Sequence, residues 1–165
     1  MKNINLNNLI TTRVETELDR VAIVGKNYTA SYSDLVISCR DMHNKKVIVF
    51  IDDILSLIKT LVSIDGLAQI ICPISTTTDS KGLYHLISKN NFDVVITDLD
   101  DEYLEIFKSL NIQILKFTDL DFNEKKINDQ NNQESIWLIQ TSGTTSLPKL
   151  VSHTLESLCA PIIKL

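Results

Sequence analysis

The residues best suited to chemistry in this sequence form one short stretch near its C-terminal end. The stretch reads Thr-Ser-Gly-Thr-Thr-Ser-Leu-Pro-Lys over positions 141–149. Its hydroxyl groups can donate hydrogen bonds to an anion, and Gly143 lets the backbone approach a phosphate closely. Successive backbone N–H groups in such a turn can form an anion-binding nest, and Lys149 adds a positive charge. The composition therefore predicts a loop that binds phosphate groups.

This stretch differs from a Walker loop. The Walker pattern needs a glycine directly before the lysine and a serine or threonine directly after it. In this chain Pro148 precedes Lys149 and Leu150 follows it. The sequence therefore disfavours a P-loop NTPase.

The segments before the stretch alternate between continuous apolar runs and amphipathic runs. Strands alternating with helices, where the strands are apolar on both faces, are typical of a parallel sheet covered by helices. We therefore expect an α/β fold in which the 141–149 loop leaves the C-terminal end of a strand, where ligands bind in such sheets. Strands are predicted over 47–51, 68–73, 93–97, 112–115 and 136–140, and helices over 54–64, 79–89 and 100–110.

Other segments are predicted to flank this repeat. Residues 21–32 indicate a hairpin, and Ser33 is placed to cap a helix that runs to about Met42. Beyond the 141–149 loop, Val151 is expected to start a short strand or turn. A helix from Thr154 is then expected to be interrupted at Pro161.

The chain is predicted to be one α/β domain over 1–165, with a solvated polar loop over 123–135 before the last strand. It carries a net charge of -5 and a sequence pI near 5.1. No basic stripe with interleaved aromatic residues is present, which disfavours nucleic acid and anionic membranes as partners.

Three cysteines, Cys39, Cys72 and Cys159, lack the spacing of a metal site. They are expected to be reduced thiols in a cytoplasmic protein. The first residues lack the apolar run of a signal peptide. No segment approaches the roughly 18 apolar residues of a membrane span.

Two other groups of residues are candidates for a functional site. Asp52 and Asp53 follow an apolar strand, where a catalytic acid could lie, but they are better explained as a helix cap and a first-turn acid. His153 lies near the 141–149 loop in sequence, so a contact with that loop stays open.

The 141–149 stretch resembles the signature of the AMP-dependent synthetase and ligase superfamily, usually Thr-Ser-Gly-Thr-Thr-Gly-x-Pro-Lys-Gly-Val. This family includes acyl-CoA synthetases, luciferases and the adenylation domains of nonribosomal peptide synthetases. Weaker similarities occur in the family's order at 32–35, 61–74 and 94–97. The positions identical to the signature are Thr141 to Thr145, Pro148, Lys149 and Val151.

The resemblance implies the N-terminal part of an ATP-dependent ligase that activates a carboxylic acid as an acyl-adenylate. It implies that the loop holds the β- and γ-phosphates of ATP and that Mg²⁺ shares their charge. No catalytic residue or metal ligand is assigned. The implied ATP-binding residues are Thr141, Ser142, Gly143, Thr144, Thr145, Ser146 and Lys149.

The sequence also departs from the family's pattern. Ser146 and Leu150 replace usual glycines, and Leu155 stands where many members carry histidine. A positive φ at Ser146 would cost of order 1 kcal/mol. These departures are expected to weaken or abolish phosphate binding by the loop.

By the same resemblance, the family's adenine-binding and ribose-binding motifs, its acidic metal contact and its C-terminal lysine would follow the phosphate loop. None of them occurs before Leu165. We therefore expect a truncated portion that does not complete the reaction alone, and another chain could supply the rest of the site. The sequence does not identify the carboxylic acid that would be activated. Both coenzyme A and a carrier protein stay open as the acceptor of the acyl group.

Two alternatives stay open. The chain could be a catalytically inactive homologue that acts as a protein-interaction module through an exposed sheet edge. It could also be a remnant without a role, which would fail to fold cooperatively.

Overall fold

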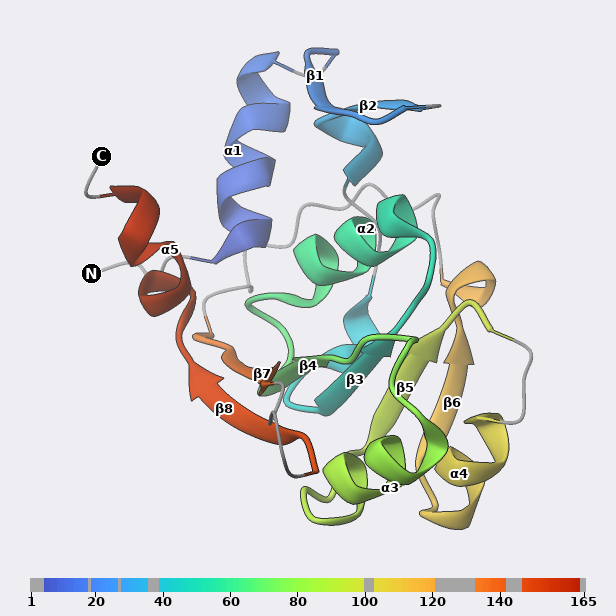
Figure 1. Cartoon of the computed structure of the whole chain (residues 1–165). Coiled ribbons are helices and arrows are strands. Elements are labelled where there is room, and N and C mark those ends of the chain that lie inside the picture. Colours follow the sequence, from blue (N-terminus) through green and yellow to red (C-terminus); the bar gives the residue numbers. More distant parts are fainter. Residues whose placement is uncertain are drawn as a thin grey trace.

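The computed structural model describes residues 5–17, 19–26, 28–35, 39–99, 103–120, 133–141 and 147–163. In these residues a six-stranded sheet carries helices on both faces (Figure 1). The strands lie in the order β6-β5-β3-β4-β7-β8. Their bounds are β3 (Lys46–Phe50), β4 (Ile70–Pro73), β5 (Val94–Thr97), β6 (Gln113–Lys116), β7 (Ile136–Thr141) and β8 (Lys149–His153).

Neighbouring strands of this sheet are parallel except β7 and β8, which are antiparallel. The predicted α/β fold with a parallel sheet is confirmed. The short strand expected from Val151 is β8, which begins two residues earlier, at Lys149, and is antiparallel to β7. Alternate residues of β3 enter different clusters, with Val47 and Val49 on one face and Ile48 and Phe50 on the other. The continuous apolar run arises because this strand is covered on both faces.

The helices that follow β3 and β4 cover opposite faces of the sheet. Helix α2 (Ile54–Ile64) lies on one face, and helices α3 (Ser80–Ser88) and α4 (Tyr103–Ser109) lie on the other (Figure 1). The structure has α2 over its predicted bounds. Its cap is Asp53, whose carboxylate accepts the Ser56 N–H, so the expected aspartate cap is present at the second residue of the Asp52–Asp53 pair.

Glycine and aspartate set the bounds of two of these helices. Gly66 follows α2 with a φ of 89°, a conformation that glycine adopts easily. Asp79 caps α3 by accepting the Gly82 N–H. Both match the boundaries predicted from the sequence.

An N-terminal part lies beside α2. It holds helix α1 (Leu6–Glu17) and strands β1 (Val21–Val24) and β2 (Thr29–Ser31), which pair antiparallel as the predicted hairpin. Helix α1 was not predicted from the sequence. Its buried face includes Asn7 and Thr11, so the apolar periodicity that would reveal it is weak.

The predicted helix from Ser33 to Met42 is wrong. The described residues there form two short 3-10 turns, Ser33–Leu35 and Arg40–Met42, with Cys39 outside them. The Ser33 and Ser31 hydroxyls bond at 2.9 Å, and the Asp34 carboxylate accepts the Ser31 N–H. These polar side chains therefore stabilise the end of the hairpin instead of capping a helix.

The C-terminal helix also differs from its prediction. Helix α5 (Leu155–Ile163) continues past Pro161, where an interruption was expected. Proline has no backbone N–H, so α5 lacks one helical hydrogen bond at Pro161 but continues for two more residues. A 3-10 turn at Phe117–Asp119 follows β6. No helix in the described part of the chain is both long and apolar enough to span a membrane.

The predicted solvated loop over 123–135 lies mostly outside the described residues. Its last residue, Ser135, is buried, against that prediction. The Ser135 hydroxyl donates to the Ala68 carbonyl at 2.8 Å and accepts the Gly66 N–H at 2.9 Å. Ser135 is buried because it satisfies two backbone groups near the end of α2.

Candidate functional site

The predicted phosphate loop leaves the sheet at the C-terminal end of β7. Because β7 is parallel to β4, this end lies at the same edge as the C-terminal ends of β3, β4 and β5. This is the edge at which parallel α/β sheets bind ligands. Five of the predicted site residues, Ser142, Gly143, Thr144, Thr145 and Ser146, lie outside the described residues.

The other two predicted site residues pair across the base of the loop. Thr141, the last residue of β7, is the register partner of Lys149, the first residue of β8. The Thr141 hydroxyl donates to the Lys149 carbonyl at 3.3 Å. Both residues are exposed, and among the described residues Lys149 forms no salt bridge. The Lys149 ammonium is therefore available to an anion, whereas the Thr141 hydroxyl is partly engaged within the hairpin.

A pair of side chains fixes the end of β7 to the neighbouring loop. The Thr78 hydroxyl donates to the Gln140 Oε1 at 3.2 Å and accepts from the Gln140 Nε2 at 3.1 Å. Thr78 belongs to a loop that follows β4 and precedes α3. Sequence reasoning did not select this residue. The available signal was four consecutive hydroxyl residues, 75–78, directly after an apolar strand.

The β7–β8 hairpin also approaches the first turn of α3. A Cβ placed on Gly82 would lie 3.4 Å from the Pro148 Cγ and 3.0 Å from the Asp79 Oδ1. A larger residue at position 82 would push against both. Gly82 therefore allows the hairpin to pack directly on the start of α3.

The acidic residues at this edge of the sheet have structural roles. The Asp98 carboxylate accepts the N–H groups of Asp52 and Asp53, which joins the end of β5 to the end of β3. The Asp52 Oδ1 accepts the Thr76 hydroxyl at 2.7 Å. The hydrogen bond from Ser56 lowers the pKa of Asp53. The predicted first-turn acid is wrong, because Asp53 is itself the cap, Asp52 precedes it, and the first turn of α2 holds no acidic residue.

His153 does not contact the described residues of the 141–149 stretch, and the buried cysteines are unreactive. His153 is at the opposite end of β8 from Lys149, and its Nδ1 lies 3.3 Å from the Ser157 hydroxyl. Burial raises the pKa of Cys39 and of Cys72 to about 12, so neither is a reactive thiolate. In the described part of the chain, no three metal-binding side chains cluster.

Comparisons with known proteins identify the fold. No family model and no curated protein matches the sequence. Among solved structures, o-succinylbenzoate CoA synthetase (MenE) from Bacillus subtilis, in complex with an acyl-adenylate intermediate, superposes with a TM-score of 0.70 and 13% identity. The superposition covers 98% of this chain and 47% of that one.

Two further structures agree. VinN in complex with L-aspartate gives a TM-score of 0.68 at 14% identity, covering 93% of this chain and 44% of that one. The N-terminal subdomain of NpsA from Klebsiella oxytoca, in complex with 3-hydroxybenzoyl-AMSN, gives 0.67 at 14% identity, covering 92% of this chain and 41% of that one. The chain spans about half the length of the solved structures it matches. Its fold is that of the N-terminal portion of acyl-adenylate-forming enzymes.

Proposed function

We propose that this chain is the N-terminal part of an ATP-dependent ligase that activates a carboxylic acid by adenylation. The observation that carries the proposal is the position of the signature. The Thr141–Lys149 stretch connects two strands at the ligand-binding edge of a sheet that has the fold of adenylate-forming enzymes. A phosphate-binding role of this stretch, including the undescribed residues 142–146, is part of the proposal.

The chemistry of the surrounding residues fits the phosphates of ATP. The exposed Lys149 provides a positive charge that no described acid neutralises. The hydroxyl-rich loop after β4 lies beside the end of β7, to which Thr78 binds. Catalysis in this reaction depends mainly on positioning the phosphates and stabilising their charge.

Mg²⁺ is proposed as the second cofactor, bound chiefly through the nucleotide. Mg²⁺ usually keeps several waters and binds proteins through one or two carboxylates together with substrate phosphates. The lack of a clustered metal-binding set in the described residues fits this mode. When bound, the ion would neutralise part of the polyphosphate charge, while Lys149 and the loop would orient it.

We propose that the remainder of the active site is formed by residues other than these 165. The matched enzymes are about twice as long as this chain. The carboxylic acid, the acyl acceptor and a chain that completes the site are therefore partners that the described residues do not specify. The two buried unpaired cysteines suit a cytoplasmic location.

The direct test is a Mg-ATP titration of the chain and of its Lys149→Ala variant, with Lys81→Ala as a control on the exposed surface of α3. We expect weak binding that the Lys149 change reduces by about tenfold and the control leaves unchanged. ATP–pyrophosphate exchange, measured with the chain alone and with candidate partner chains, then tests adenylation. The proposal fails if no nucleotide binds and no pairing supports exchange.

A protein-interaction module is the second candidate function. It is favoured by β8, the last strand of the sheet order, where Val151 is 42% exposed. Edge strands with unpaired backbone groups recruit other strands. Light scattering of the purified chain distinguishes the two functions, because a clean monomer that binds Mg-ATP contradicts a docking role.

A further inference from the structure

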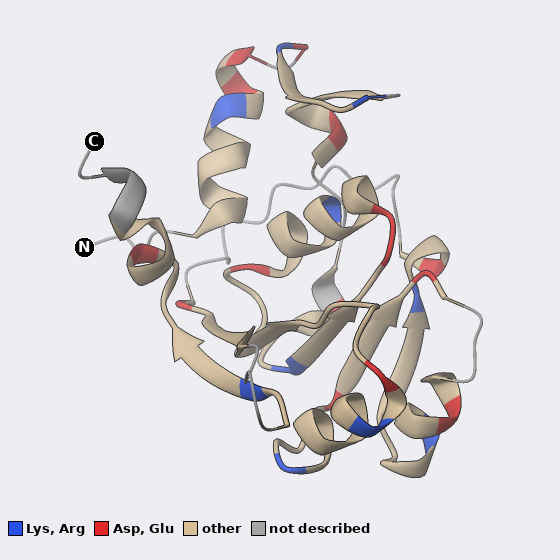
Figure 2. Ribbon diagram, in the orientation of Figure 1, with Lys and Arg blue, Asp and Glu red and all other residues tan. Residues whose placement is uncertain are grey.

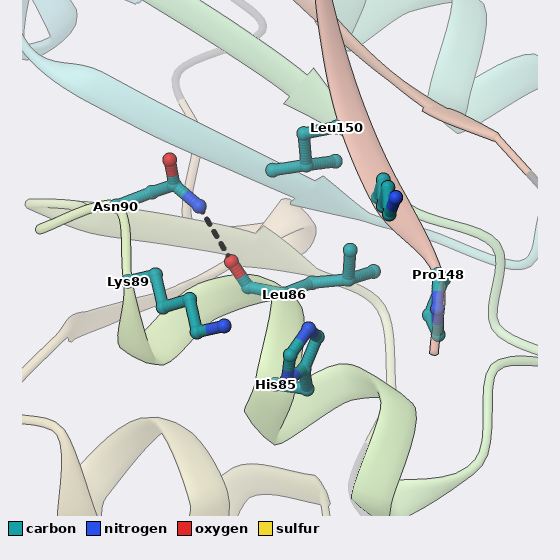
Figure 3. Close-up of a pocket in the computed structure, with 7 residues that line it drawn as sticks. His85, Leu86, Lys89, Asn90, Pro148 and Leu150 are labelled. Atoms are coloured by element: carbon teal, nitrogen blue, oxygen red, sulfur yellow. Dashed lines mark hydrogen bonds between the residues drawn. The ribbon is translucent and has the colours of Figure 1, made fainter. Parts of the chain in front are cut away.

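A groove of about 340 Å³ lies between α3 and the beginning of β8 (Figure 3). Its volume is near the lower end of the roughly 300–1,000 Å³ of small-molecule pockets. Two segments form it: residues 85–90, at the C-terminal end of α3 and just after it, and residues 148–150, at the end of the signature stretch and the start of β8. The lining residues are His85, Leu86, Lys89, Asn90, Pro148, Lys149 and Leu150.

The ionisable side chains that line the groove are all basic. They are His85, Lys89 and Lys149, and no acidic residue lines it. Neither lysine has a salt-bridge partner among the described residues. Basic residues at the C-terminal end of α3 also suit the helix dipole. That explanation does not extend to Lys149, which comes from a different element, and Figure 2 shows basic positions just after α3 and at the start of β8.

The other side of the lining is apolar and firmly positioned. Leu86, Pro148 and Leu150 provide this surface. Asn90 donates its side-chain N–H to the Leu86 carbonyl at 2.7 Å, which fixes the amide at one end of the groove (Figure 3). The close approach of Pro148 to Gly82 fixes the hairpin against α3 at the other side.

We propose that this groove binds a phosphate monoester that carries an apolar group. Three basic side chains match a dianion, and the leucine and proline side chains match an attached ring or short chain. The groove shares Pro148 and Lys149 with the end of the 141–149 stretch, and its other lining residues lie outside that stretch. The assignment is therefore separate from ATP binding and does not require that the loop bind nucleotide.

Phenyl phosphate is the test ligand, because it combines the dianion with an apolar ring. Its affinity is measured by NMR titration of the full chain and of two groove variants, Lys89→Gln and His85→Gln. The matched control is Lys81→Gln, which removes a lysine of α3 that does not line the groove. We expect Lys89→Gln to weaken binding about tenfold and His85→Gln to weaken it less. The control should bind as the wild type does.

Two comparison ligands separate the contributions. Phenol keeps the ring without the charge, and inorganic phosphate keeps the charge without the ring, so both should bind more weakly than phenyl phosphate. Backbone amide shifts should concentrate at Leu86 and Leu150. Equal affinity of wild type and Lys89→Gln, or equal binding of phenol, would overturn the proposal.

A Mg-ATP titration of the same variants keeps the two proposals distinguishable. Lys89→Gln should leave Mg-ATP affinity unchanged if ATP binds at the loop. If no variant binds ATP but phenyl phosphate binding still depends on Lys89, the groove stands and the loop assignment fails. If Mg-ATP binding depends on Lys89 as strongly as phenyl phosphate binding does, there is one nucleotide site and the separate groove is rejected.

Discussion

Thr78 and Gln140 bind each other through two side-chain hydrogen bonds, although 62 residues separate them in the sequence. Thr78 is buried, and the Gln140 amide lies just before the signature loop. The pair joins the loop after β4 to the end of β7. The orientation of the loop's first residue, Thr141, therefore depends on a contact outside the signature itself.

Replacing Thr78 by valine keeps the shape of the side chain and removes the hydroxyl. We expect the free energy of unfolding to fall by about 1–3 kcal/mol, because the Gln140 amide loses its partner in a partly buried site. Mg-ATP affinity should fall several-fold as the end of β7 loosens. Urea unfolding and nucleotide titration measure the two effects. Thr77→Val, at an exposed neighbouring position, is the control, and equal effects of both changes would contradict the assigned role.

Gly66 should resist substitution for two separate reasons. Its φ of 89° disfavours residues with a Cβ, and an added Cβ would lie 2.6 Å from the Asn5 Nδ2. We expect Gly66→Ala to destabilise the fold by about 2 kcal/mol or more. Gly66→Asn tolerates the positive φ better but keeps the contact, so it should lose less than alanine and still unfold at lower urea. An asparagine variant as stable as wild type would show that Asn5 moves freely.

Asp65 is a buried carboxyl group that links α1 to the end of α2. It is 1% exposed, and burial raises its pKa although its carboxylate accepts the Leu6 N–H at 2.7 Å. The buried Trp137 indole N–H has no hydrogen-bond partner among the described residues. It nevertheless favours the charged form of the Asp65 carboxyl group and so opposes the rise in its pKa. A raised pKa means that the folded chain binds the proton more tightly than the unfolded chain does.

The sign of the pH dependence follows from this raised pKa. The Asp65 contribution to stability is fully present below the unfolded pKa and is lost as the pH rises through the folded pKa. We expect Asp65→Asn to gain stability relative to wild type as the pH rises above 3.8, the ordinary pKa of an aspartate side chain. Asp53→Asn, which keeps a helix cap and removes a group whose pKa is lowered, should show the opposite trend. Urea unfolding is measured on both sides of pH 3.8, because the Asp53 contribution changes below this value and the Asp65 contribution changes above it. Parallel trends would contradict the assignment.

The cysteines should differ in reactivity towards a thiol reagent. Cys39 and Cys72 are buried, and burial raises the pKa of each to about 12, whereas Cys159 is partly exposed. We expect iodoacetamide to modify Cys159 alone in the folded chain and all three thiols in urea. Peptide mass mapping reads the result. Rapid labelling of Cys72 in the folded chain would show that the core around β4 opens readily.

The sequence predicted the elements whose cause is local. The caps Asp53 and Asp79 bound α2 and α3, and the apolar runs of the parallel strands marked a sheet covered on both faces. The family resemblance located the 141–149 stretch, and the fold agrees with it. In each case the determining residues lie within a few positions of the element they define.

Tertiary contacts decided the features that the sequence did not reveal. Helix α1 depends on Asp65, far along the chain, for an acceptor at its first turn. Ser135 follows a polar segment and was therefore expected to be solvated. It is buried, because its hydroxyl forms hydrogen bonds with the Gly66 N–H and the Ala68 carbonyl. The Thr78–Gln140 contact has no periodic signal, because it joins the loop after β4 to the end of β7, and these become neighbours only after the sheet forms.

The antiparallel return of β8 affects how this chain could balance the charge of a nucleotide. Where a phosphate loop opens a helix, the first helical turn contributes about half a positive charge to the bound anion. Strand β7 instead leads to strand β8, which runs back antiparallel beside it. Helix α5 begins only after β8, at the opposite end of this strand from Lys149. Ammonium, hydroxyl and metal contributions would have to replace that helical field, which makes ionic strength a sensitive control of occupancy at the hairpin.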